Sequence, residues 1–173
     1  MTLFITLVAI LQPFSISLGV GSSTLAIVNF FVTIADGAID ETERRMMGVV
    51  YVVLRVATLM ILLTTGALVS IEFTNGGIVG FSTIIYAQLL TLIMLFVNAS
   101  LMTARVMPST YGPALQAGSW YTLGTLSALQ IVGIVNFSFL NFLFGYITWL
   151  ILAVAIVNGI MSVLAARRKG KLH

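Results

Sequence analysis

The sequence predicts an all-α integral membrane protein built as one bundle of five transmembrane helices. Of its 173 residues 60% are hydrophobic and only 8% are charged, and the mean hydropathy is +1.13. A soluble domain carries about 25% charged residues, so this chain has too little polar surface to face water on all sides. Its apolar runs are continuous and do not alternate with a period of two, which disfavours a membrane β-barrel.

The first apolar stretch is longer than one span. Residues 2–35 contain no charge, whereas about 20 residues suffice to cross a bilayer. Pro13 follows Gln12, and a proline in a helix interior kinks or breaks the helix. We therefore expect residues 2–12 to form a helical extension at the outer surface, or a half-helix, before the first full span.

Polar segments divide the rest of the chain. Asp40 with Glu43 is typical of a helix N-cap followed by an acidic third residue, so a helix should begin near Glu41. Turns are expected near Thr74 and in the proline-containing segment 108–113. The expected spans are residues 14–35, 46–70, 78–105, 114–135 and 142–166, followed by a basic tail at 167–173.

The basic residues predict the orientation. Seven of the eight Lys and Arg lie in or beside the segments 36–45 and 106–113 and the C-terminal tail, which five alternating spans place on one side. The opposite loops, 71–77 and 136–141, contain none. The positive-inside rule then predicts an outside N-terminus and a cytoplasmic C-terminus. We expect a multi-pass protein of the plasma (inner) membrane, and this topology explains the net charge of +3 without a nucleic-acid partner.

Arg55 is the basic residue that the topology does not explain. It lies inside the apolar run 46–70, and the predicted spans contain no Asp or Glu to neutralise it. An ionisable residue within a span indicates a functional site, because a buried unpaired charge costs several kcal/mol. Three interpretations stay open: Arg55 snorkels back to the inner headgroups, binds an anion such as a carboxylate, phosphate or halide, or joins a structural hydrogen-bond network.

Counting the same number of residues in both directions from each expected turn predicts which residues lie at the same depth in the membrane as Arg55. The count reaches Ser22–Thr24 across the first hairpin, then Gln88, then Gln130. Four asparagines in or at the ends of the spans are expected to form interhelical hydrogen bonds and not to bind a ligand: Asn29, Asn98, Asn141 and Asn158. The predicted ligand-binding residues are Arg55, Ser22, Ser23, Thr24, Gln88 and Gln130.

Small residues suggest close helix contacts. Gly19 with Ser23, and Gly124 with Ala128, have the spacing that lets two helices approach closely. The segment 19–24 also suits a local unwinding whose amides bind an anion. The tryptophans, Trp120 among them, are expected at the membrane interfaces.

The sequence offers little for metal or covalent chemistry. Asp36, Asp40 and Glu43 resemble half of a calcium loop, but Val32 and Ile34 occupy the positions of the first acidic ligands. There is no cysteine, and the single histidine is the last residue. We expect no cofactor and no enzymatic activity, since an intramembrane enzyme would need a nucleophile or an acid–base pair that the sequence does not show.

Two functional hypotheses remain. The first is a channel or transporter for an anion or small polar solute that uses Arg55, assembled as a homo-oligomer because five spans are few for a permeation path. The alternative is a non-catalytic accessory or scaffold subunit of a membrane complex, with its small-residue faces bound to a partner protein, or a lipid-binding membrane protein. No motif is specific enough to indicate a family.

Overall fold

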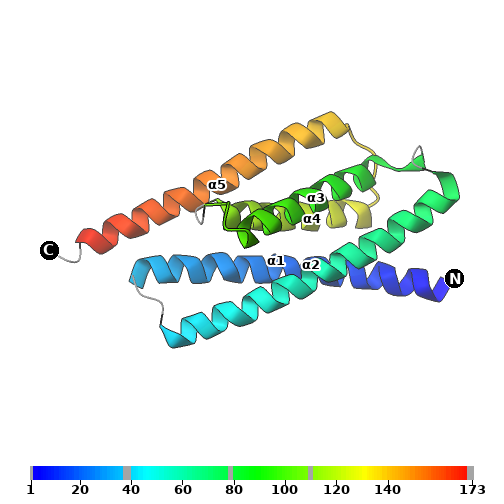
Figure 1. Cartoon of the computed structure of the whole chain (residues 1–173). Helices are drawn as coiled ribbons and strands as arrows, with labels where there is room; N and C mark the ends of the chain where they lie inside the picture. The colour runs from blue at the N-terminus through cyan, green and yellow to red at the C-terminus, as the bar shows by residue number, and fades with distance from the viewer. Residues whose placement is uncertain (1, 37–39, 78–79, 109–110, 171–173) are drawn as a thin grey trace.

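The computed structural model describes residues 2–36, 40–77, 80–108 and 111–170, and it confirms an all-α bundle of five helices. Successive helices run in opposite directions, so the N-terminal and C-terminal ends of the chain lie at opposite ends of the bundle (Figure 1). The helices are α1 (Thr2–Asp36), α2 (Glu41–Gly76), α3 (Thr83–Thr103), α4 (Gly112–Ile131) and α5 (Phe139–Gly170).

Helix α4 is the centre of the bundle. It packs against α1, α3 and α5, whereas α2 packs chiefly along α1. Trp120, in the middle of α4, is completely buried. It belongs to an apolar group contributed by α1, α2, α3 and α4, which we call the central cluster. The central cluster comprises Ile16, Ala57, Ile61, Leu92, Leu95, Trp120 and Leu123.

Four helices, α1, α2, α3 and α5, are long and apolar enough to cross a membrane, judged over the described residues. The chain is therefore a polytopic membrane protein in contact with the lipid bilayer. Helix α4 is not among the four, although its 20 residues extend about 30 Å, the thickness of a hydrocarbon core. Its neighbours shield it from lipid, so it can carry small and polar residues.

Residues 2–12 are helical, as expected, but Pro13 does not separate them from the first span. Helix α1 continues through Pro13, and residues 2–12 are its first turns and not a separate extension. The proline removes one helical hydrogen bond, but ending the helix in a bilayer would leave several backbone groups unpaired. Packing also holds this part of α1, since Val8 and Gln12 are buried and the Gln12 side-chain amide donates to the Thr65 hydroxyl at 3.3 Å.

The predicted start of α2 is confirmed. Asp40 is the N-cap, and its carboxylate accepts from the Glu43 backbone N–H at 2.6 Å. The Glu43 carboxylate accepts in turn from the Asp40 N–H at 3.2 Å. The predicted end is six residues short, because α2 continues to Gly76 and stops where Gly77 adopts a positive φ of 64°.

Candidate functional site

Arg55 lines an open groove of about 550 Å³ between α2 and α3, which we call the Arg55 groove. Helix α4 closes its inner side through Gln116. The walls are mainly apolar, and none of the described lining residues is acidic. The lining residues are Tyr51, Leu54, Arg55, Thr58, Leu59, Ala99, Met102, Thr103 and Gln116.

Arg55 lies at the edge of the bundle and not at its centre. Its side chain is exposed, and no hydrogen bond or ion pair joins it to another residue of the described chain. Its neighbours across the groove, Met102 and Thr103, form the last turn of α3. At 21 residues, α3 extends about 32 Å, close to the thickness of a hydrocarbon core, so a span centred on α3 would have its last turn at the edge of that layer. This depth favours the headgroup side over the midplane.

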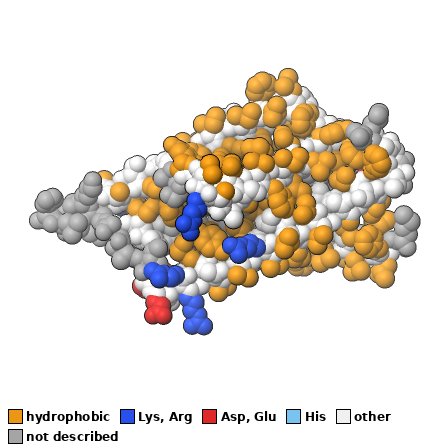
Figure 2. All heavy atoms as spheres, viewed as in Figure 1, with side chains coloured by type: hydrophobic (Ala, Val, Ile, Leu, Met, Phe, Trp, Pro, Cys, Tyr) orange, Lys and Arg blue, Asp and Glu red, His pale blue; other side chains and the backbone are white. Residues whose placement is uncertain are grey.

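Basic side chains gather at the same end of the molecule. Arg105 follows the end of α3, with a backbone φ of 58°, and Arg44 and Arg45 lie in the first turns of α2. Figure 2 shows Lys and Arg concentrated toward the end where α1 finishes and α2 begins, while the rest of this face is largely hydrophobic. Asp40, Glu41 and Glu43 lie at the same start of α2, so acidic side chains accompany the basic ones at this end.

Asn98 and Gln116 form a buried polar pair behind the Arg55 groove. The Asn98 side-chain N–H₂ donates to the Gln116 side-chain oxygen at 3.0 Å and to the Gly112 carbonyl at 2.9 Å. Both side chains are more than nine-tenths buried. The predicted interhelical role is confirmed for Asn98, whereas the described residues show no interhelical side-chain bond of Asn29, Asn141 or Asn158. Gln116 was missed, because its position in the groove depends on the place where α3 turns into α4.

The serines and threonine of α1 serve mainly their own helix. The hydroxyls of Ser22, Ser23 and Thr24 donate to carbonyls three or four residues earlier, at 2.6, 3.0 and 2.7 Å. Helix α1 is continuous here, so the structure agrees with close helix packing at these small residues and not with the alternative of a local unwinding. Ser23 lines a cavity of about 30 Å³ that shares Tyr51 with the Arg55 groove. Ser23 therefore lines a cavity that adjoins the Arg55 groove, and Arg55 is not part of that cavity's lining.

Gln88 and Gln130 pair with each other, away from Arg55. The Gln88 amide donates to the Gln130 side-chain oxygen at 3.1 Å. They lie near the start of α3 and the end of α4, so the central cluster separates them from the Arg55 groove. The structure thus splits the expected polar layer in two.

The split has a geometric cause. The sequence placed the second turn near Thr74, whereas α2 ends at Gly76 and α3 begins at Thr83. Moving the centre of a hairpin by about five residues moves the opposite residue by about ten, or about 15 Å along a helix. Arg55 therefore faces the end of α3 near Thr103, and not Gln88.

The small residues act within the chain. A Cβ on Gly19 would overlap the Trp120 ring, and one on Gly124 would contact Val20 at 3.5 Å. Both glycines therefore lie in the α1–α4 contact and allow its close approach. Trp120 is buried there, so its predicted place at a membrane interface is wrong.

Two of the three residues considered as calcium ligands, Asp40 and Glu43, cap a helix instead. The carboxylates of Asp40 and Glu43 form the capping box of α2, and the Asp36 side chain lies outside the described residues. Within the described ranges, no group of three or more His, Cys, Asp or Glu side chains is placed to hold a metal ion.

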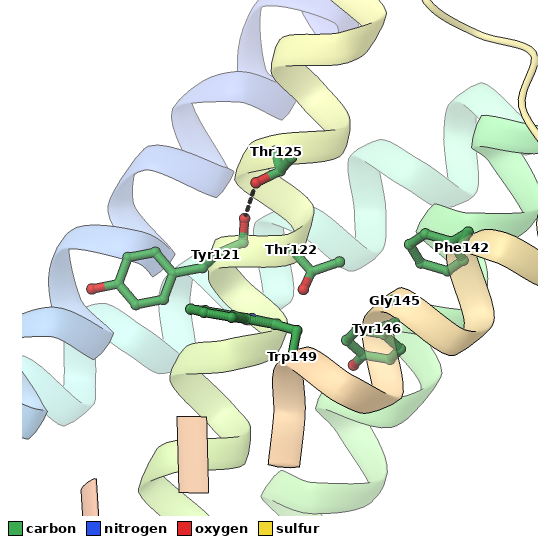
Figure 3. A pocket seen from close by; sticks show the side chains of 7 residues that line it. All are labelled: Tyr121, Thr122, Thr125, Phe142, Gly145, Tyr146 and Trp149. Atoms are coloured by element: carbon green, nitrogen blue, oxygen red, sulfur yellow. Dashed lines mark hydrogen bonds between the residues drawn. The ribbon is translucent and has the colours of Figure 1, made fainter. Parts of the chain in front are cut away.

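A second cavity, of about 410 Å³, lies between α4 and α5 (Figure 3). Its aromatic walls include Tyr121, Phe142, Tyr146 and Trp149. The Trp149 indole N–H donates to the Gly118 carbonyl at 3.0 Å, and the Tyr146 hydroxyl bonds Ser119 at 2.8 Å. Since these polar groups already have partners, the cavity is an apolar space without a charged group to select a ligand.

The fold defines a multi-pass helical membrane protein with cavities between its helices. No known family model, curated protein or solved structure matches the chain.

Proposed function

We propose that the protein binds an anionic lipid in the Arg55 groove. The observation that carries this proposal is an exposed arginine, unpaired within the described chain, in an apolar groove beside the last turn of α3. An acyl chain fits the side formed by Leu54, Leu59 and Ala99, and Arg55 neutralises the headgroup. A basic residue near an anionic membrane surface contributes about 1 kcal/mol. The proposal assigns no catalytic step to the protein.

The same geometry gives the transport hypothesis less support. The polar regions around Gln116 and around Gln130 are separated by the central cluster, with Trp120 in its middle. A path for an anion through one chain would have to cross this apolar region. The scaffold hypothesis also loses its expected surface, because Gly19 and Gly124 already pack α1 against α4.

The positive-inside distribution supports a cytoplasmic orientation for the groove, with the N-terminus outside and the C-terminus inside the plasma (inner) membrane. A reporter enzyme active only in the periplasm or only in the cytoplasm, fused to the C-terminus, tests this topology. We expect activity from the cytoplasmic reporter alone. Activity from the periplasmic reporter alone would reverse the proposed orientation.

Lipid retention tests the binding proposal. The purified chain is reconstituted in nanodiscs of phosphatidylcholine with a minor fraction of phosphatidylglycerol, and bound lipid is measured by native mass spectrometry. The Arg55→Gln variant should lose the preference for phosphatidylglycerol by about fivefold, the equivalent of 1 kcal/mol. The control is Arg44→Gln, which removes an arginine of α2 that is not part of the groove lining.

An unchanged lipid preference in Arg55→Gln would contradict the proposal. Liposomes containing the same variants test the transport hypothesis separately. Anion flux in the wild type that disappears in Arg55→Gln, with no change in lipid retention, would favour transport instead.

A further inference from the structure

We infer that Gln116 is a second hydrogen-bond donor to the headgroup and that the groove selects a lipid phosphate. This inference rests on the proposed function and names the ligand class of the same site. Arg55 supplies the charge from α2, and Gln116 supplies a neutral N–H from α4, on the inner side of the groove.

The hydrogen bonds of Gln116 determine which end of its amide faces the groove. Its side-chain oxygen accepts from Asn98, which also binds the Gly112 carbonyl. The opposite end, the side-chain N–H₂, has no partner within the described residues. Two side-chain atoms in the described residues are fully buried without a partner, the Asn98 oxygen and the Trp120 indole nitrogen. The Gln116 nitrogen is not one of them, so it is not fully buried. The Gln116 nitrogen therefore keeps some accessible surface, and Gln116 lines both the Arg55 groove and the adjoining cavity of about 30 Å³. We place this donor toward the larger of the two spaces, the Arg55 groove.

Asn98 is the positioning residue for this donor. Its N–H₂ can bind only an acceptor, so it holds the Gln116 oxygen toward α3 and turns the Gln116 nitrogen away. An amide free to flip would present oxygen and nitrogen alike, and an oxygen facing the groove would repel an anion. The Asn98–Gln116 bond excludes that second orientation.

The arrangement of donors favours a phosphate over a carboxylate. Arg55 and Gln116 line the groove from different helices, α2 and α4, and Met102 of α3 lines it as well. A tetrahedral phosphate presents oxygens in divergent directions and can accept from both sides, whereas a carboxylate presents its two oxygens in one plane. The nearby hydroxyls of Thr58 and Thr103 donate to their own helices at 2.8 Å, so they add no competing donor.

The test measures binding of two single-chain probes of equal length, dodecyl phosphate and dodecanoate, to the purified full chain in a neutral detergent. Gln116→Met keeps the length of the side chain but removes the donor. We expect it to weaken dodecyl phosphate binding about tenfold, the loss expected for a hydrogen bond to a charged group, with a smaller effect on dodecanoate. The control is Gln12→Met, which removes a buried glutamine that bonds Thr65 outside the groove.

A second variant keeps the test decisive if Gln116→Met unfolds. Gln116→Glu retains an oxygen to accept from Asn98 but replaces the donor with an acceptor, so phosphate binding should fall by more than in Gln116→Met. Salt separates the two contributions: the loss in Gln116→Met should be the same at low and high salt, while the loss in Arg55→Gln should shrink as salt screens the charge.

The possible results distinguish the two proposals. Weaker binding of dodecyl phosphate in Arg55→Gln, with no change in either Gln116 variant, would overturn this inference and leave the proposed lipid site intact. No change in any of the three variants would overturn both. Equal losses for phosphate and carboxylate probes in Gln116→Met would retain the donor role and overturn the preference for phosphate.

Discussion

Helix α4 is surrounded mainly by other helices, whereas helix α2 exposes much of its surface to lipid. Helix α4 is rich in glycine, serine and threonine, and half of its 20 residues are buried, from Gly112 to Leu126. Helix α2 is more apolar in its span but packs chiefly against α1, and it exposes large side chains such as Leu63, Leu59 and Val49. In a soluble protein the apolar helix would be inside. Here lipid surrounds the bundle, so apolar side chains face outward and small or polar ones can pack inside.

The two helices also differ in the number of hydrogen bonds that join them to their neighbours. Interhelical hydrogen bonds join α4 to its neighbours: Asn98 binds Gln116, Trp149 binds the Gly118 carbonyl, and Thr24 bonds Tyr121 at 2.7 Å. For α2, Gln12 to Thr65 is the interhelical bond found within the described residues. Since lipid removes most of the hydrophobic driving force between helices, packing and hydrogen bonds stabilise α4 more than α2.

The largest expected effect comes from emptying the centre of α4. Trp120→Ala removes a side chain with no exposed surface and leaves a cavity in the central cluster. We expect a loss of about 3 kcal/mol or more in the free energy of unfolding, because the surrounding helices cannot fully collapse. Unfolding by titration with a denaturing detergent measures this loss.

Leu63→Ala on α2 is the matched change at a lipid-facing position. Leu63 is 71% exposed, so its truncation should alter the free energy of unfolding by less than about 0.5 kcal/mol. Similar losses in the two variants would contradict the difference drawn between α4 and α2.

A smaller effect is expected where α1 meets α4. Gly19→Ala places a methyl group against the Trp120 ring, which has no free space to move into. Overpacking of this kind costs about 1–3 kcal/mol. Gly21→Ala is the control, because a methyl group there meets no atom within 4 Å. Thermal unfolding of the two variants in the same detergent compares them, and a Gly21→Ala protein as unstable as Gly19→Ala would disprove the close packing.

The sequence was sufficient to predict much of the fold. Composition identified a helical membrane protein, and the polar segments separated the five helices. The start of α2 was correct to the residue because Asp40 and Glu43 form a purely local capping motif. Pro13 was misleading, since its local effect is outweighed by the need to keep the backbone of α1 bonded through the membrane.

The candidate site was only partly predictable. Arg55 stood out because a charge in an apolar run is conspicuous in any arrangement. Its neighbours depend on the lengths of the turns, where an error of a few residues exchanged Gln88 for Thr103. Gln116 carries no local signal, because a glutamine near the start of a helix is ordinary until Asn98 and the groove are placed beside it.

The smallest of these effects concerns the beginning of α2. A helix with few interhelical bonds should depend on its own cap, and the Asp40 carboxylate accepts from the Glu43 backbone N–H, which has no acceptor within α2. Asp40→Ala should reduce the free energy of unfolding by about 1 kcal/mol, whereas Asp40→Asn keeps an accepting oxygen and should cost less. Ser82→Ala at the start of α3 is the control, because Ser82 is an N-cap whose side chain makes no capping bond. Detergent-induced unfolding of the three variants measures the differences. If Asp40→Ala proves as stable as Ser82→Ala, then packing on α1 is enough to hold the start of α2, and α2 differs from α4 in composition more than in how it is stabilised.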